Sequence, residues 1–187
     1  MAEGESTRLA PPIQAPDFTA TTLEGEKITL SSLRGTAVWL AFFRYAMCPL
    51  CNFRIHQLMQ VWPQQFGGRE FRMLGVFQSP AKKLEGIIER HSPPFKVISD
   101  PEMELYAQYR VETSWSGMMG KDVRNGLAGA LKAGIPMVKP WDGPANRVPA
   151  DFLIDGDGMI RVVFYGENMA QHIPFEDVQG FLTEIGC

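Results

Sequence analysis

Residues 37–51, AVWLAFFRYAMCPLC, hold an apolar run followed by a dithiol, Cys48 and Cys51. The run 37–43 shows no alternation of apolar and polar positions, which predicts a strand covered on both faces, as in the middle of a parallel sheet. From Pro49 onward, apolar residues recur in steps of three and four, which predicts an amphipathic helix. These residues are Ile55, Leu58, Met59, Trp62 and Phe66. A buried strand that leads into a CxxC motif at the start of a helix indicates a redox site.

Predicted strands and helices alternate along the rest of the chain. The predicted strands span 71–77 and 96–99, and the predicted helices span 80–91, 101–109 and 175–185. Turn residues between apolar runs predict two hairpins, one within residues 17–30 and one within residues 151–165. This order predicts an α/β fold with a central mixed sheet, helices on both faces of the sheet and an N-terminal hairpin.

The length of 187 residues suits one domain with a sizeable core, and a second full domain is not expected. We expect residues 1–14 to form a flexible leader and residues 15–187 to form a single domain. Residues 112–147 are expected to be an insertion, because they are too long for an ordinary connection between elements. Within the insertion, residues 118–133 suit a helix that is weakened by its glycines.

Composition and charge narrow the classes of partner. The net charge of −3 lacks the concentrated basic footprint that nucleic-acid binding requires. No stretch approaches the roughly 18–20 apolar residues that span a bilayer. The first 14 residues also lack the basic and apolar segments of a secretory signal. We therefore expect no nucleic acid and no membrane as partners, and a cytoplasmic location.

The chemistry of the dithiol depends on its ionisation. A thiolate, and not a thiol, attacks a peroxide or a disulfide, so a reactive cysteine needs a lowered pKa. The helix N-terminus at Cys48 and Cys51 favours negative charge, and Arg44 and Arg54 can add positive potential. Buried structural thiols and a zinc site are weaker alternatives, because one CxxC supplies only two of the four ligands of a closed zinc site. We expect neither a metal nor another cofactor.

Two further segments carry a recognisable pattern. The first joins Ala15-Pro16-Asp17-Phe18 to residues 25–35, GEKITLSSLRG, and the second is residues 148–160, VPADFLIDGDGMI. They resemble the start and the penultimate hairpin of the redoxin group, which includes the peroxiredoxins of the AhpC/TSA (alkyl hydroperoxide reductase/thiol-specific antioxidant) family. The resemblance covers most of residues 15–111 and 148–185 and implies a thioredoxin fold, whereas residues 112–147 have no counterpart.

The peroxiredoxin signature, Pro-x-x-x-Thr/Ser-x-x-Cys, is only partly present. Laid on it, Cys51 takes the place of the peroxidatic cysteine, Cys48 that of the Thr or Ser, and Arg44 that of the proline. The family arginine that orients the peroxide has no match, since Pro149 falls near its place and Arg147 is a neighbour. In thioredoxin-like oxidoreductases the first cysteine attacks, the second resolves, and a cis-proline lies opposite the dithiol. The resemblance implies that Pro149 is this proline and shapes the substrate groove.

We interpret the chain as a thiol-dependent redox protein of peroxiredoxin-like type. It is expected to reduce peroxides or disulfides through a dithiol–disulfide cycle of Cys48 and Cys51, with Arg44 tuning the thiolate. A thiol reductant, such as a thioredoxin or glutathione system, would restore the dithiol. The oxidant and the cysteine that attacks first stay open. The alternative is a non-catalytic redox-sensing or binding module whose dithiol acts as a switch.

The third cysteine, Cys187, is the last residue of the chain. We expect it to lie in a frayed terminus. The alternative, that it resolves a disulfide between the subunits of a homodimer, stays open.

Overall fold

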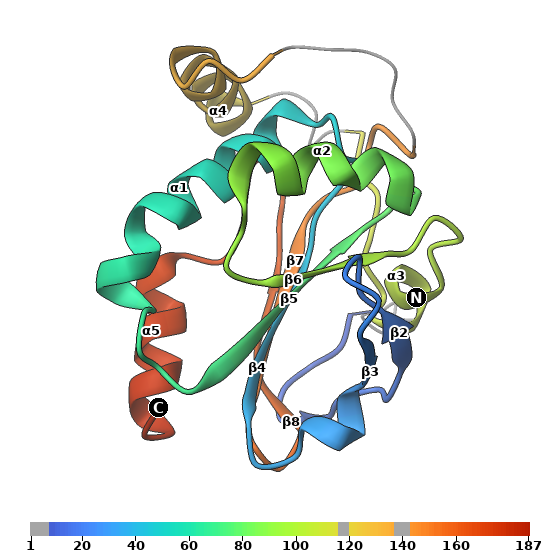
Figure 1. The fold of residues 1–187 in the computed structure, drawn as a ribbon, viewed down its shortest axis with the longest axis vertical. Helices are drawn as coiled ribbons and strands as arrows, with labels where there is room; N and C mark the ends of the chain where they lie inside the picture. Colours follow the sequence, from blue (N-terminus) through green and yellow to red (C-terminus); the bar gives the residue numbers. More distant parts are fainter. Residues whose placement is uncertain (1–7, 116–119, 137–142) are drawn as a thin grey trace, which may run out of the picture.

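The computed structural model describes residues 8–115, 120–136 and 143–187. At its centre lies a six-stranded mixed sheet of order β1-β8-β7-β4-β5-β6 (Figure 1). In that order the strands are Ile13–Gln14, Met159–Tyr165, Ala150–Ile154, Ala37–Phe42, Phe71–Phe77 and Lys96–Ser99. β4, β5 and β6 run parallel, whereas β7 is antiparallel to β4, β8 to β7 and β1 to β8.

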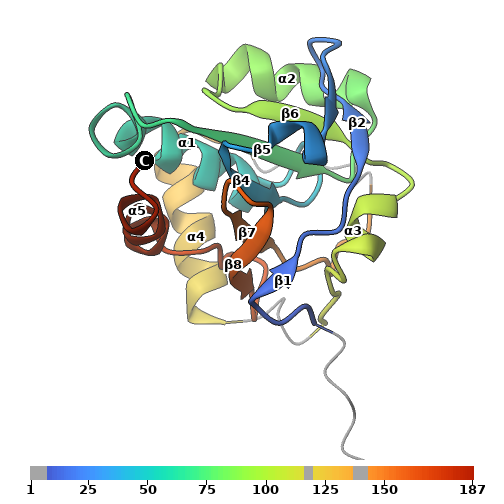
Figure 2. The ribbon, with the colours of Figure 1, turned by 90° about the horizontal axis from the view of Figure 1, so that it is seen from below.

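Helices cover both faces of this sheet, which confirms the predicted α/β class. One face packs against the helices α1, α2 and α5, which span Pro49–Gln65, Ala81–His91 and Phe175–Glu184. The opposite face packs against α3 and the hairpin β2–β3, as Figure 2 shows. These elements span Glu104–Gln108, Thr19–Thr21 and Lys27–Thr29, and a 3₁₀ turn, Leu30–Leu33, follows the hairpin.

Strand β4 is buried along its whole length, as its unbroken apolar sequence predicts. Its side chains alternate between the two cores. Trp39 and Ala41 point to the side of α1, and Leu40 and Phe42 point to the side of α3. The strand therefore delivers the chain from the middle of the protein to the start of α1, where the cysteines lie.

The predicted leader is wrong for residues 8–14, and residues 1–7 lie outside the described part. Leu9 is buried, and its N–H donates to the hydroxyl of Tyr165 at 3.1 Å. Strand β1 pairs with β8 through Ile13–Ile160 and Gln14–Met159. The edge of β8 would otherwise expose unpaired backbone groups, and the short strand β1 satisfies part of that edge.

Helix α3 begins later than the predicted residue 101. The carboxylate of Asp100 accepts hydrogen bonds from the backbone N–H groups of Glu104 and Leu105, at 3.1 and 2.9 Å. A side chain that accepts from free N–H groups marks the start of a helix. Residues 101–103 accordingly form a turn between Asp100 and the helix.

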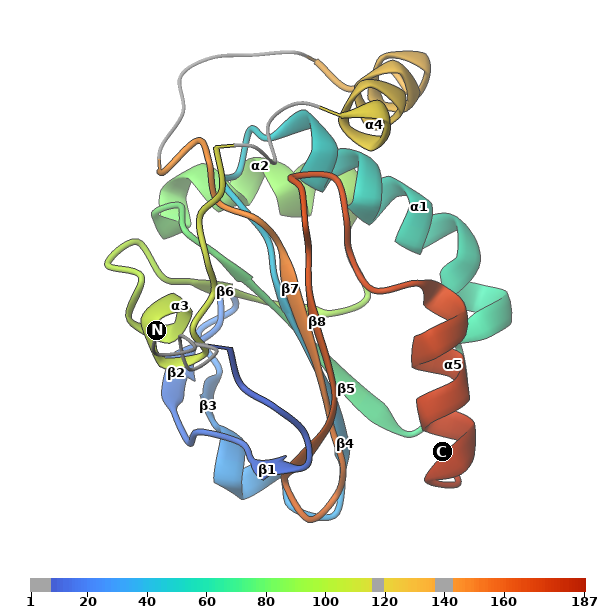
Figure 3. The same cartoon turned by 180° about the vertical axis from the view of Figure 1, so that it is seen from behind.

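The described residues of the insertion contain the helix α4 (Lys121–Lys132), which lies beside the first half of α1 (Figure 3). Residues 118–119 of the predicted helix lie outside the described part. Two glycines allow this close approach. A Cβ atom on Gly126 would lie 2.7 Å from Leu50 Cδ2, and one on Gly129 would lie 2.4 Å from the Phe53 ring. The glycines that weaken the helix in isolation therefore let it dock.

The same substitution at two helical glycines should have opposite effects on stability. Gly129→Ala should lower the free energy of unfolding by about 1–3 kcal/mol, because the added methyl group overlaps Phe53. Gly86→Ala is the matched control. No atom lies within 4 Å of a Cβ there, so higher helix propensity should raise stability by about 0.5–1 kcal/mol. Urea denaturation measures both, and equal effects of the two changes would contradict the close docking of α4.

Candidate dithiol site

The two cysteines lie in the first turn of α1. Cys48 is the N-cap residue, and its Sγ accepts a hydrogen bond from the backbone N–H of Cys51 at 3.4 Å. Pro49 follows at the first helical position, where its missing N–H costs no hydrogen bond. Both cysteines are free thiols, as is Cys187. The sulfur of Cys48 thus stands where free N–H groups and the helix dipole favour negative charge.

Arg44 contacts both cysteines, so the structure brings the three predicted site residues together. Its Nη1–H donates to Cys48 Sγ at 3.1 Å, and its backbone N–H donates to Cys51 Sγ at 3.3 Å. The guanidinium lies 5.0 Å from the centre of the Tyr45 ring. Arg44 is itself buried, so its positive charge acts on the sulfur without much screening by water.

The two thiols have different pKa values because their surroundings differ. Burial opposes ionisation of Cys48, but hydrogen bonding from the Cys51 thiol, the charge of Arg44 and backbone N–H groups outweigh it and lower the pKa of Cys48 to about 6. Burial and the neighbouring Cys48 thiolate raise the pKa of Cys51 well above its usual value. At neutral pH the pair is therefore a thiolate at Cys48 and a thiol at Cys51.

Asn52 holds the loop that carries the cysteines, and the sequence did not predict this role. Its Nδ2 donates to the carbonyls of Ala46 and Cys48 at 2.8 and 2.9 Å. Its Oδ1 accepts from Arg90 Nη1 at 3.2 Å and contacts His91 Nε2 at 3.1 Å. A single buried amide therefore joins the dithiol loop to the end of α2. Its position directly after Cys51 was the one available signal.

A strap at the end of the insertion, residues 143–147, bonds to the side chains of Arg44 and Gln78. Gln78 Nε2 donates to the Pro144 carbonyl at 3.2 Å, and Arg44 Nη2 donates to the Ala145 carbonyl. Gly143 lies so close to Gln78 that a Cβ atom would be 2.3 Å from Nε2. Two buried atoms of the residues that bond to this strap, Arg44 Nε and Gln78 Oε1, have no hydrogen-bond partner among the described residues.

The predicted cis bond at Pro149 is wrong. Pro11–Pro12 is the cis bond among the described residues, so the Val148–Pro149 bond is trans. The Pro149 carbonyl accepts from the Gly166 N–H at 2.9 Å, which extends the pairing of β7 with β8 and leads the chain straight into the sheet. A role of Pro149 in shaping the substrate groove stays a prediction.

The other two arginines considered in the sequence analysis, Arg147 and Arg54, do not contact the sulfurs. Arg147 donates to the Val111 carbonyl and lies 5.1 Å from the centre of the Tyr106 ring. Arg54 lies 3.7 Å from the centre of the Phe175 ring. Arg44 is therefore the guanidinium that bonds to the dithiol in the described part of the structure.

Other features of the described residues offer no competing centre. No group of three or more His, Cys, Asp or Glu side chains there could hold a metal ion. None of the described helices combines the length and apolar character that crossing a membrane requires.

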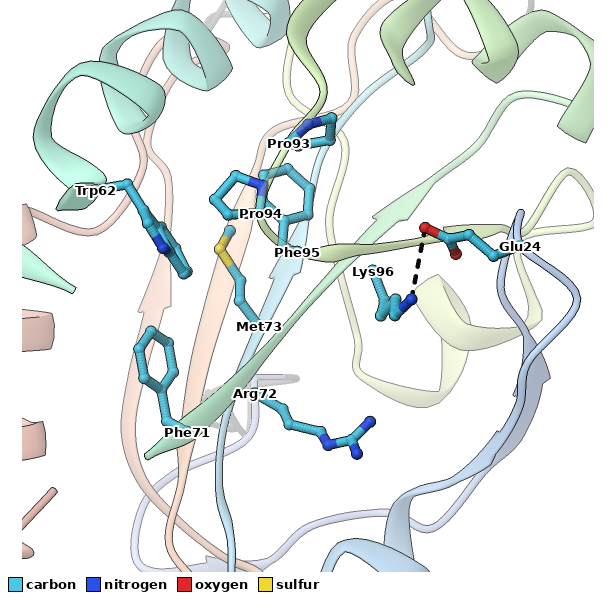
Figure 4. A pocket seen from close by; sticks show the side chains of 9 residues that line it. All are labelled: Glu24, Trp62, Phe71, Arg72, Met73, Pro93, Pro94, Phe95 and Lys96. Atoms are coloured by element: carbon cyan, nitrogen blue, oxygen red, sulfur yellow. Dashed lines mark ion pairs between the residues drawn. The ribbon is translucent and has the colours of Figure 1, made fainter. Parts of the chain in front are cut away.

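A pocket of about 270 Å³ lies between the end of α1 and strands β5 and β6. Figure 4 shows that Trp62, Phe71 and Met73 line one side of it and the Glu24–Lys96 ion pair the other, and no cysteine lines it.

Removal of the Arg44 charge should make Cys48 less acidic. In Arg44→Gln the pKa of Cys48 should rise from about 6 by about one to two units, because the thiolate loses its cationic partner. Thiolate absorbance near 240 nm, followed against pH, measures this change. Arg72→Gln is the control, because Arg72 is exposed and pairs with Glu26. An unchanged titration in Arg44→Gln would show that the helix N-terminus alone sets the acidity.

The sequence of the chain matches a known protein family. The AhpC/TSA family matches residues 13–163. Peroxiredoxin Bcp of Escherichia coli K12 is 26% identical over 160 residues, which cover 84% of this chain and 86% of that protein. A Bcp-type relative from Coxiella burnetii is 30% identical over 98 residues, and there the chain spans 64% of the relative's length.

Solved structures share the fold. Peroxidoxin BcpB of Mycobacterium tuberculosis superposes with a TM-score of 0.66 at 19% identity, covering 94% of this chain and 97% of that one. A peroxiredoxin-like protein from Aquifex aeolicus gives a TM-score of 0.68 at 13% identity, with coverages of 95% and 88%. With the buried strand, the CxxC motif at the start of α1 and the family match over most of its length, the chain belongs to the AhpC/TSA family and is a thiol-dependent oxidoreductase of peroxiredoxin-like type.

Proposed function

We propose that the protein reduces a hydroperoxide by attack of Cys48, and that Cys51 then closes an intramolecular disulfide. The observation that carries this proposal is the environment of Cys48 Sγ, which is buried and accepts a hydrogen bond from Arg44 at 3.1 Å. A lowered pKa makes Cys48 the nucleophile at neutral pH. The attacking sulfur is thus the first of the pair, although Cys51 occupies the peroxidatic position of the family signature.

The burial of the dithiol favours a small oxidant. In this dithiol state Cys48 is 0% exposed and Cys51 is 1% exposed, so the two sulfurs are not open to a disulfide on a folded partner. A hydroperoxide needs far less space. It also carries both a hydrogen-bond donor and acceptors, which match the unpartnered Nε–H of Arg44, the residue that bonds to Cys48, and the unpartnered Oε1 of Gln78, whose backbone N–H bonds to the Arg44 carbonyl. These groups would take over the task of the missing signature hydroxyl and arginine, which is to stabilise the oxygens as their bond breaks.

The proposed reaction uses both thiols. The Cys48 thiolate attacks one oxygen of ROOH, the O–O bond breaks, and the leaving alkoxide takes a proton to form ROH. Cys48 is then a sulfenic acid. The Cys51 thiol attacks the sulfenic sulfur, and water leaves as the disulfide forms. A thiol reductant returns the disulfide to the two thiols, and the reducing cytoplasm that we propose as the location would supply it.

The two cysteines should differ in their roles in peroxide consumption. Cys48→Ser should abolish oxidation by hydrogen peroxide. Cys51→Ser should still react once and accumulate a sulfenic acid, because the resolving thiol is missing. Stopped-flow measurement of peroxide loss and chemical trapping of the sulfenic acid test both results.

Three outcomes would contradict this assignment. Retained oxidation in Cys48→Ser together with its loss in Cys51→Ser would place the attack on Cys51. A mixed disulfide that accumulates on Cys48 in Cys51→Ser, without any reaction with peroxide, would make a protein disulfide the substrate. A protein that oxidises once and stays oxidised, despite a reductase and excess peroxide, would be a redox sensor.

A further inference from the structure

The insertion forms one wall of a groove beside the dithiol. Helix α4 faces α1 and residues 170–172 across a cavity of about 350 Å³. Leu50, the residue next to Cys51 between the two cysteines, lines this cavity and packs against Gly126 of α4. Arg54 and His172 also line it. The groove thus begins at Leu50, which lies between the two cysteines in the sequence, and ends at a buried charged cluster, and neither cysteine lines it.

A buried carboxylate orients His172 in this groove. Asp151 Oδ2 lies 3.1 Å from His172 Nδ1 and accepts from the Ile173 N–H at 3.0 Å. Its Oδ1 accepts from Trp39 Nε1 at 2.9 Å. The Phe43 ring lies against the imidazole, with the ring centres 4.8 Å apart. The position of the imidazole is therefore fixed on two sides.

The hydrogen bond to Asp151 also fixes the tautomer of His172. Burial opposes ionisation of Asp151, but His172, Arg54 and the Ile173 N–H outweigh it and lower the pKa of Asp151. Burial lowers the pKa of His172 more than Asp151 raises it. A carboxylate can only accept, so Nδ1 of the neutral imidazole carries the proton. Nε2 is then a proton acceptor, and it has no hydrogen-bond partner among the described residues.

Charged groups from three elements face His172. Asp151 comes from β7, and Arg54 of α1 lowers the pKa of the imidazole through its positive charge. Asp122 of α4 lines the same groove, and Gln171 and Asn168 bond to it at 3.0 and 3.3 Å. The rim is thus polar, while Leu50 and other apolar groups line part of the wall.

We propose that this groove receives a low-molecular-weight thiol, and that His172 Nε2 takes its proton during reduction of the Cys48–Cys51 disulfide. The inference rests on the proposed function, because it concerns the reductive half of the same cycle. Oxidation needs no base, since Cys48 is already a thiolate. A free thiol with a pKa of about 8.5 is mostly protonated at neutral pH, so reduction is the half-reaction that lacks a base. The cavity volume of about 350 Å³ suits a small molecule.

The reductive steps balance with two equivalents of thiol. The first RSH gives its proton to His172, and the thiolate attacks Cys48, so that the S–S bond breaks and Cys51 leaves. Cys51, whose pKa is raised, takes up a proton. A second RSH then gives its proton to His172, and its thiolate attacks the mixed disulfide on Cys48 and releases RSSR and the Cys48 thiolate. Of the two protons, one ends on Cys51 and His172 returns the other to solvent.

His172→Gln tests the base. The protein is oxidised with diamide, so that the test does not depend on peroxide chemistry, and its reduction by glutathione is followed in single turnovers. At pH 7 the variant should be reduced at least tenfold more slowly than the wild-type protein, whereas its rate of oxidation by hydrogen peroxide, measured separately, should stay close to that of the wild-type protein. Its rate of reduction should then rise about tenfold per pH unit up to the pKa of the reductant. The wild-type rate should change little between pH 7 and that pKa, because neutral His172 supplies the base.

Asn125→Trp tests the groove. Asn125 is exposed and lines the cavity, so the indole would fill it without disturbing the core. Ala128→Trp is the matched control, on an exposed position of the same helix that does not line the cavity. Asn125→Trp should slow reduction by glutathione at least tenfold, with little effect of Ala128→Trp. Reduction by thioredoxin should be slowed less than reduction by glutathione.

Several results would overturn the inference while leaving the proposed function intact. Equal slowing of both half-reactions in His172→Gln, or an unchanged pH profile, would make His172 structural. If Asn125→Trp slowed reduction by glutathione and reduction by thioredoxin equally, the occupant of the groove would be a protein thiol. If it slowed neither reaction, the groove would not be the binding site of the reductant. Failure of the wild-type protein to form the disulfide with peroxide would instead overturn the proposed function.

Discussion

A thiolate and a guanidinium buried side by side are the constraint on which the site depends. Removing two charges from water is costly, and the cost is offset only if the partners are held at hydrogen-bond distance and their remaining groups are satisfied. Cys48 Sγ accepts hydrogen bonds from Arg44 and from a backbone N–H, and Asn52 donates to two carbonyls of the same loop. Arg44 Nε is the one group of the pair that lacks a partner among the described residues. On the other side, Ser79 Oγ accepts from the Ala46 N–H at 2.7 Å. The loop is thus fixed from α1, α2 and the end of β5.

The protein holds two buried negative groups on one face of its sheet, and each has its own cation. Arg44 bonds to Cys48, whereas His172 and, to a smaller extent, the charge of Arg54 lower the pKa of Asp151. Because different groups stabilise the two charges, the sulfur and the carboxylate do not share one counter-ion. The ionisation of one pair can therefore change during a reaction cycle while the other keeps its charge.

The parts of the fold that follow a local pattern could be predicted from the sequence. The apolar run of β4, the helical spacing after Pro49 and the Asp-Gly turn before β8 each depend on neighbours a few residues apart. The start of α3 and the pairing of β1 depend on partners that sequence periodicity does not reveal, Asp100 and β8. Those elements were therefore misplaced or missed.

The same distinction applies to the candidate site. Arg44, Cys48 and Cys51 are close in sequence, and their meeting follows from one loop and one helical turn. Gln78 and His172 reach the dithiol region or its groove from distant segments, so they could not be inferred before the topology was known. Pro149 directly precedes β7, and the pairing that extends β7 sets its backbone geometry.

The glycine-mediated docking of α4 has a consequence for how this protein can diverge. Helix α4 packs against α1 through Gly126 and Gly129. It takes no part in the sheet, and none of its groups bonds to the sulfurs. Its exposed residues can therefore be exchanged by mutation while the fold and the acidity of the thiol are kept. Selection can thus act on the width and polarity of the groove separately from the reactivity of the dithiol, so paralogues of this chain could acquire new preferences through α4 alone.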